Sequence, residues 1–89
     1  NLEVTDIDRR IKCQLIRYTI MNIEEETEEA KNILINTYLL AKENGRYFKA
    51  GELAMRVGKY FNDNKDESQA SYYLNEGIRL FSEAEQLQN

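Results

Sequence analysis

The chain has 89 residues and a formal net charge of −4 at pH 7, with 42% hydrophobic and 31% charged residues. This balance excludes a disordered tail, and the acidic surplus argues against nucleic acids or anionic membranes as partners, because both are bound through clustered Lys and Arg. The length fits one domain, residues 1–89, and the missing initial Met leads us to expect a piece of a longer chain.

The residue types favour an all-α fold. There is no proline, only four glycines are present, and helix formers such as Leu, Ile, Ala, Glu and Lys are abundant. The single cysteine, Cys13, allows no intramolecular disulfide, and with no signal-peptide pattern we expect a cytoplasmic protein. No run of 18 apolar residues occurs, so we expect no membrane insertion.

The first two predicted helices occupy the N-terminal half. We assign Thr5 as the N-cap of the first helix, which ends near Asn22. The second begins in the acidic run 24–29, where carboxylates favour a helix N-terminus, and ends at Gly45, since glycine tolerates the left-handed conformation. Apolar spacings of three and four residues give the inner faces: Ile7, Ile11, Leu15 and Tyr18 in the first helix, and Ala30, Ile33, Leu34, Thr37, Tyr38 and Ala41 in the second.

The third predicted helix covers residues 47–62, and the fourth ends near Gln88. Residues 62–65 are predicted to form the turn, and Asp66 with Gln69 matches a capping box. Gly51, Gly58 and Gly77 cost helix propensity, so we expect the helices to pack closely there. The predicted inner faces are Ala50, Leu53, Ala54, Val57 and Phe61 in the third helix, and Ala70, Tyr73, Leu74, Gly77, Leu80, Phe81, Ala84 and Leu87 in the fourth.

The chain partly overlays itself when shifted by about 40 residues. Ala30 then falls on Ala70 and Leu34 on Leu74. The sequence thus predicts two helix–turn–helix units, covering about residues 5–44 and about 46–87.

The second unit resembles a tetratricopeptide repeat (TPR). The resemblance is carried by Val57, Gly58, Phe61, Ala70, Leu74, Gly77 and Ile78. It implies four helices in two antiparallel hairpins, with Gly58 touching Ala70 and the first helix of each hairpin lining a binding surface. The first unit departs from the pattern, because Tyr18 and Thr37 occupy the places of Gly58 and Gly77. A three- or four-helix bundle is the alternative.

Residues 41–87 also resemble a microtubule-interacting-and-trafficking (MIT) domain. That resemblance rests on Gly45, Arg46, Tyr47, Ala50, Tyr60, Phe61, Tyr73, Leu74, Ala84, Glu85, Gln86 and Leu87. It implies a three-helix bundle that binds short helical peptides, and it leaves the first helix as an addition.

No constellation of catalytic residues is visible. The chain lacks histidine, so Cys13 has no partner for nucleophilic catalysis, and we expect it to be buried at a helix interface. The acidic run 24–29 lacks the spacing of a cation loop, and the dispersed glycines form no phosphate-binding loop. We therefore expect no enzymatic activity, no metal site and no cofactor.

The expected function is a protein- or peptide-binding adaptor or scaffold. The alternative is a sensor segment of a bacterial peptide-responsive regulator, because such receptors use long-helix repeats. The candidate partner-binding face is formed by Lys12, Leu15, Thr19, Asn22, Glu52, Met55, Lys59 and Asn62.

Some apolar residues exceed what a hairpin partner could cover. They are Cys13, Ile16 and Ile20 in the first helix, and Ile78 and Phe81 in the fourth. These extra stripes predict a homodimer or a larger helical array.

Overall fold

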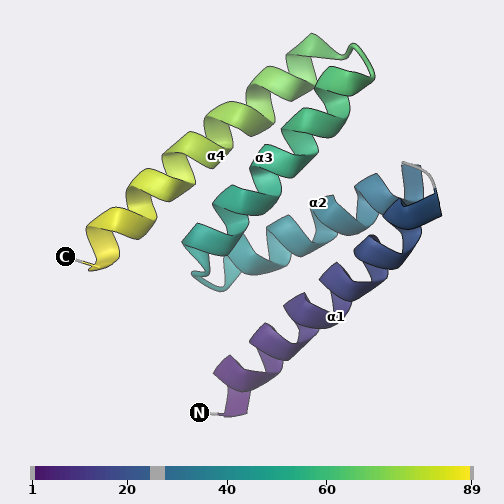
Figure 1. Cartoon of the computed structure of the whole chain (residues 1–89). Helices are drawn as coiled ribbons and strands as arrows, with labels where there is room; N and C mark the ends of the chain where they lie inside the picture. Colours follow the sequence, from purple (N-terminus) through teal and green to yellow (C-terminus); the bar gives the residue numbers. More distant parts are fainter. Residues whose placement is uncertain (1, 25–27, 89) are drawn as a thin grey trace.

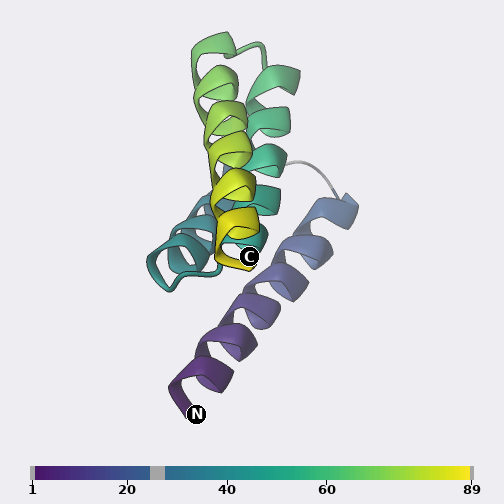
Figure 2. The ribbon, with the colours of Figure 1, turned by 90° about the vertical axis from the view of Figure 1, so that its left-hand side faces the viewer.

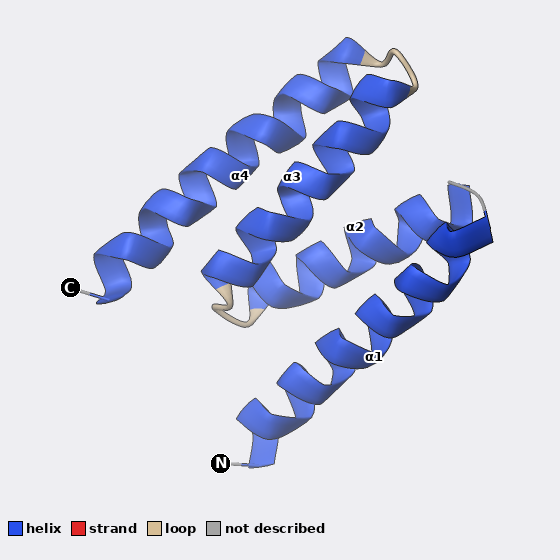
Figure 3. Cartoon of the chain, in the orientation of Figure 1, coloured by secondary structure: helices blue, strands red, loops and turns tan. Residues whose placement is uncertain are grey.

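The computed structural model describes the backbone of residues 2–24 and 28–88 and the side chains of residues 6–19 and 28–87. It contains four α-helices: α1 (Leu2–Glu24), α2 (Glu28–Glu43), α3 (Tyr47–Asp63) and α4 (Glu67–Gln88) (Figures 1 and 3). No strand occurs in these ranges. The prediction of an all-α protein with four helices is confirmed, whereas its arrangement as TPR hairpins stays a prediction.

The helices stack in chain order. Within the described ranges, backbones approach closely only between consecutive helices, α1 with α2, α2 with α3 and α3 with α4. Helices α3 and α4 run side by side in opposite directions (Figure 1), and the N-terminal end of α1 diverges from the other three helices (Figure 2). The result is a slab of 39 × 26 × 16 Å whose core lies between α2 and the other helices.

Helix α2 supplies the centre of the core. All six residues of its predicted inner face are buried, which confirms the periodicity. Thr37 is fully buried, and its hydroxyl donates a 2.7 Å hydrogen bond to the carbonyl of Ile33, so the polar group is satisfied within its own helix. The main apolar cluster comprises Ile11, Leu34, Tyr38, Ala41, Ala50, Leu53, Ala54, Val57 and Leu80.

Glycines bring α3 and α4 into close contact. A Cβ atom placed on Gly58 would lie 3.3 Å from the carbonyl oxygen of Ala70, which confirms the predicted contact between these residues. A Cβ atom on Gly77 would lie 3.2 Å from the carbonyl oxygen of Gly51. Larger residues at these positions would push the two helices apart, since interiors are close-packed.

The ends of α2 and α3 share one backbone motif. After α2, the amides of Gly45 and Arg46 donate to the carbonyls of Lys42 and Ala41, at 3.3 and 2.8 Å. After α3, the corresponding bonds run from residue 65 to residue 62 at 3.0 Å and from residue 66 to residue 61 at 2.9 Å. These are Schellman motifs, which place one residue in the left-handed region. Gly45 takes that place with φ 74°, as predicted, but Lys65 takes it with φ 63°.

Asp66 caps α4, but the capping box is only half formed. One carboxylate oxygen of Asp66 accepts a 3.3 Å hydrogen bond from the amide of Gln69. The amide of Asp66 donates to the carbonyl of Phe61, 2.9 Å away, so it serves the preceding helix end instead of the Gln69 side chain. The turn between α3 and α4 accordingly begins at Asn64, because Asn62 and Asp63 belong to α3.

The N-cap predicted for α1 is wrong, and two other predicted boundaries are shifted by a few residues. Thr5 is no N-cap, because α1 begins at Leu2. Helix α1 continues past Asn22 to Glu24, so the acidic run does not open α2 as a whole. Residues 25–27 lie outside the described residues, and Glu28 and Glu29 form the acidic first turn of α2.

Three predictions of burial are also wrong, those for Cys13, Leu87 and Leu74. Cys13 is exposed, because α1 packs on α2 along one side and leaves its other sides open. In α4, Leu87 is 70% exposed, since the helix continues beyond its neighbour there. The other predicted inner residues of α4 are buried or half-buried, except Leu74, which is 37% exposed.

Candidate functional site

A groove of about 600 Å³ lies between α1, the turn before α3, and the C-terminal part of α4. We call it the α1–α4 groove. Its lining is largely apolar and includes four charged residues, Asp8, Lys12, Arg46 and Lys49. It is lined by Asp8, Ile11, Lys12, Leu15, Gly45, Arg46, Tyr47, Phe48, Lys49, Ala84 and Leu87.

The groove follows from the way α1 is held. Ile11 is buried and Leu15 half-buried, so this side of α1 joins the core. Further toward the N-terminus, Asp8 accepts a 2.8 Å hydrogen bond from Nε of Arg46, and this ion pair ties α1 to the turn after α2. The left-handed residue Gly45 reverses the chain so that Arg46 and Tyr47 emerge at the edge of the groove.

The lining is positively charged although the chain is acidic. Three cations, Lys12, Arg46 and Lys49, stand against one carboxylate, Asp8. Lys49 also pairs with Glu52 at 3.1 Å, outside the groove lining. A carboxylate that entered the groove would therefore meet a favourable local potential, which the overall charge of −4 does not reveal.

The predicted partner-binding residues of α1 are brought together. Lys12 and Leu15 line the α1–α4 groove, and the same two residues form a shallow apolar surface with Ile16 and Thr19. The side chain of Asn22 lies outside the described residues.

The predicted residues of α3 form a separate surface. Glu52 borders a shallow depression with Phe48, Phe81, Ala84 and Glu85, and Lys59 and Asn62 are exposed nearer the C-terminal end of α3. The described backbones of α1 and α3 do not come close, and the two sets of predicted residues adjoin only through Phe48 and Ala84, which line both the groove and this depression.

The prediction that Met55 points away from its partner helix is wrong. Its Sδ atom would lie 2.7 Å from a Cβ atom placed on Gly77, so the side chain lies against α4. The Met55 side chain occupies the space that a side chain at Gly77 would fill.

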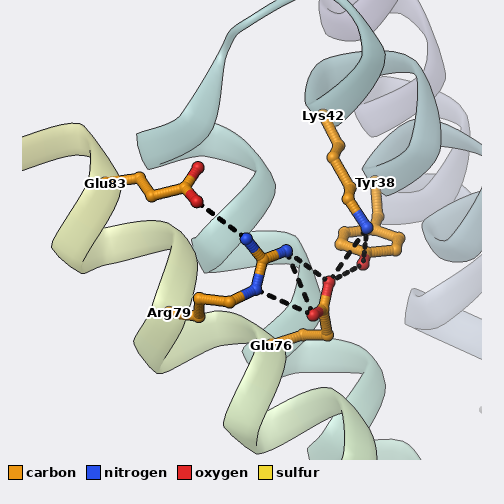
Figure 4. A network of polar contacts seen from close by, with 5 residues as sticks. All are labelled: Tyr38, Lys42, Glu76, Arg79 and Glu83. Atoms are coloured by element: carbon orange, nitrogen blue, oxygen red, sulfur yellow. Dashed lines mark hydrogen bonds and ion pairs between the residues drawn. The ribbon is translucent and has the colours of Figure 1, made fainter. Parts of the chain in front are cut away.

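A polar network joins α2 to α4, and sequence reasoning missed it (Figure 4). The hydroxyl of Tyr38 donates a 2.6 Å hydrogen bond to Oε1 of Glu76, and Lys42 donates to the same oxygen at 3.1 Å. Arg79 donates to both carboxylate oxygens of Glu76 at 3.1 Å, and to Glu83 at 2.8 Å. Only the spacing of Glu76, Arg79 and Glu83 along one helix was visible beforehand.

The network stabilises one charge state of each member. Hydrogen bonds from Arg79 and Tyr38 lower the pKa of Glu76 to about 2, against an opposing effect of burial. Burial and the hydrogen bond to Glu76 raise the pKa of Tyr38 above its usual value. Glu76 therefore stays ionised and Tyr38 protonated near neutral pH, which suits a structural connection rather than proton transfer.

Comparisons of the chain with protein-family models, with curated proteins and with solved structures find no match. No helix in the described ranges is both long and apolar enough to cross a membrane. The same ranges contain no group of three or more Cys, Asp or Glu side chains placed to hold a metal ion.

Proposed function

We propose that the chain is a non-catalytic protein-binding module that holds a helical segment of another protein in the α1–α4 groove. The observation that carries the proposal is the combination of a largely apolar lining with a surplus of cations over carboxylates among its charged residues. Exposed apolar surface rimmed by polar groups is typical of an interaction site.

The lining indicates an amphipathic, acidic partner. Leu15, Phe48 and Leu87 offer apolar surface to side chains that recur every three or four residues along a helix. Lys12 and Lys49 would face carboxylates beside that apolar stripe. The charges set the orientation and the rate of association more than the affinity, which comes from burial of the apolar side chains.

The resemblance to TPR repeats supports the same proposal, because it also implies a surface lined by the first and third helices. A TPR-like arrangement of the two hairpins is therefore part of the proposal. The MIT-like alternative likewise implies a helical peptide ligand. A binding role is favoured over an enzymatic one because the chain lacks histidine and the carboxylate in the groove lining, Asp8, is paired with Arg46.

The test is a selection of peptides on the 89-residue chain. A phage-displayed library of amphipathic helices with randomised charged positions is selected on the wild-type protein. We expect enriched peptides to carry Asp or Glu beside the apolar stripe. Their affinity, measured by fluorescence anisotropy, should fall by about tenfold or more for Lys12→Glu/Lys49→Glu.

A matched control keeps the net charge of that variant. Arg9→Glu/Arg56→Glu also reverses one exposed cation on α1 and one on α3, both outside the groove lining, and should bind nearly as tightly as the wild type. The proposal is overturned if no peptide is enriched. Equal loss in the two double variants would show that the groove is not the binding site.

A further inference from the structure

We infer that a second copy of this chain docks on the outer face of α3 and α4, related to the first by a two-fold axis. The outer face is formed by Phe48, Glu52, Met55 and Lys59 on α3 and by Leu74, Ile78, Phe81 and Glu85 on α4. The inference does not depend on the proposed function, because Phe48 is the one residue that the outer face shares with the lining of the α1–α4 groove.

The outer face lies opposite α2. Leu53 and Val57 belong to the core that α3 shares with α2. On α4, Tyr73 and Glu76 meet Tyr38 of α2, through a ring contact of 5.8 Å and the 2.6 Å hydrogen bond. The residues of the outer face occupy other sides of the same two helices, at spacings of three and four residues. Within the described ranges, no helix backbone other than that of α3 comes close to α4.

Large apolar side chains are exposed on this face. Ile78 is 62% exposed, Phe48 59% and Leu74 37%. The rings of Phe48 and Phe81 lie 5.4 Å apart, so their exposed surface is continuous across the two helices. An apolar patch that spans two helices is typical of a protein interface, since leaving it in water is unfavourable.

The pattern along each helix is self-complementary. The side chain of Met55 on α3 packs against Gly77 on α4. We take this contact as the middle of the outer face. Glu52 lies three residues before Met55 and Lys59 four residues after it. Leu74 and Phe81 lie at the same distances from Gly77.

A two-fold axis in the plane of the interface, crossing both helices at the Met55–Gly77 contact, brings these pairs together. It places Glu52 against Lys59 of the second copy. It also places Leu74 against Phe81 of the second copy, and Ile78 near its own counterpart. Each Glu52–Lys59 pair would connect two existing ion pairs, Lys49–Glu52 at 3.1 Å and Lys59–Asp63 at 3.1 Å, into a row of alternating charges. Such isologous pairing is the commonest form of assembly for soluble proteins.

Sedimentation equilibrium of charge-reversal variants tests the symmetry directly. Glu52→Lys and Lys59→Glu each place like charges opposite one another twice, so each variant alone should dimerise at least about tenfold more weakly than the wild type. An equimolar mixture of the two restores both attractive pairs and should form heterodimers. The double variant Glu52→Lys/Lys59→Glu also restores both intermolecular pairs, at the expense of the Lys49–Glu52 and Lys59–Asp63 pairs within each chain, and should dimerise more tightly than either single variant.

Ile78→Glu tests the apolar centre of the same face. It should yield a monomer whose circular dichroism spectrum matches that of the wild type, because Ile78 is mostly exposed in the single chain. The control is Ile16→Glu, which changes a residue of similar exposure, 60%, on α1 and should leave the dimer intact. A wild-type chain that stays monomeric at high micromolar concentration overturns the inference. A mixture of the two charge variants that associates no more tightly than either variant by itself also overturns the inference. So does the result that Ile16→Glu is monomeric while Ile78→Glu remains a dimer.

Discussion

The side chain of Tyr38 reaches from α2 to Glu76 on α4, where its hydroxyl donates a 2.6 Å hydrogen bond to the carboxylate. Tyr38 is only 2% exposed, and Lys42 and Arg79 complete the shell around Glu76. Since the backbones of α2 and α4 do not come close within the described ranges, this contact connects two helices that are not neighbours in the stack. It thereby fixes how α4 sits relative to the core.

Removal of the Tyr38 hydroxyl should destabilise the fold. Tyr38→Phe keeps the edge-to-face ring contact with Tyr73 but leaves Glu76 without one donor. Hydrogen bonds to charged groups contribute about 1.5–3 kcal/mol, so we expect a loss of that order in the free energy of unfolding, measured by urea denaturation. Tyr72→Phe, at a residue 54% exposed, is the control and should change little. A Tyr38→Phe variant as stable as the wild type would show that the hydrogen bond contributes nothing.

The stability of the chain should depend on Glu76 in acid. The pKa of Glu76 is about 2 in the folded chain against a usual value of 4.5, so between these pH values the unfolded state binds more protons. The contribution of Glu76 is therefore present above pH 4.5 and is lost as the pH falls toward 2. We expect the difference in melting temperature between wild type and Glu76→Gln to shrink across this window. If the difference in melting temperature stayed constant over this pH range, the ionised carboxylate of Glu76 would not be what stabilises the chain.

Lys65→Gly should stabilise the chain. Lys65 holds a left-handed conformation, with φ 63°, that costs an L-residue roughly 1–2 kcal/mol, whereas glycine adopts it freely. Part of the gain is lost to the greater freedom of glycine in the unfolded chain, so we expect about 0.5–1 kcal/mol in the free energy of unfolding.

The reverse change at the end of α2 provides the control for Lys65→Gly. Gly45 has φ 74°, and no atom would lie within 4 Å of an added Cβ, so Gly45→Ala tests conformation without steric conflict. It should destabilise the chain by about 1 kcal/mol. If both variants shift stability in the same direction, the left-handed positions do not control it.

Gly58→Leu should weaken the α3–α4 interface. Even a Cβ atom at this position would come within 2.9 Å of Leu74 and 3.3 Å of the carbonyl oxygen of Ala70, and the backbone cannot yield easily. Overpacking of this kind costs about 1–3 kcal/mol, which thermal denaturation would register as a lower melting temperature. Ser71→Leu adds a similar side chain at an exposed position of α4 and should have little effect. An unchanged melting temperature for Gly58→Leu would mean that the close approach is not needed.

The parts of the fold that depend on local spacing could be predicted from the sequence. The six inner residues of α2 and the Gly45 helix end were predicted correctly, because periodicity and the left-handed preference of glycine act over a few residues. Lys65 was not predicted to take the same conformation, since its own side chain disfavours it and the hydrogen bonds of the turn impose it. The exposure of Cys13 depends on which side of α1 meets α2, and periodicity alone did not settle this.

The candidate site could be predicted only in part. Lys12 and Leu15 were identified from their place on the first helix, and both line the groove. Arg46 and Lys49 were not, because they approach Lys12 only through the tertiary packing of α1 against the turn after α2. The hydrogen bond between Tyr38 and Glu76 joins residues 38 positions apart, and no local sequence pattern predicts it.

The stacking of each helix on its neighbours in sequence also bears on how the chain reaches its fold. Because close backbone contacts in the described ranges 2–24 and 28–88 join only consecutive helices, no long loop there has to close before a helix can dock. Folding dominated by such local contacts is fast, on the order of microseconds to milliseconds for helical proteins. During synthesis, the α1–α2 pair could form while α3 and α4 are still being made, and each later helix would find its docking surface already exposed at the end of the growing stack.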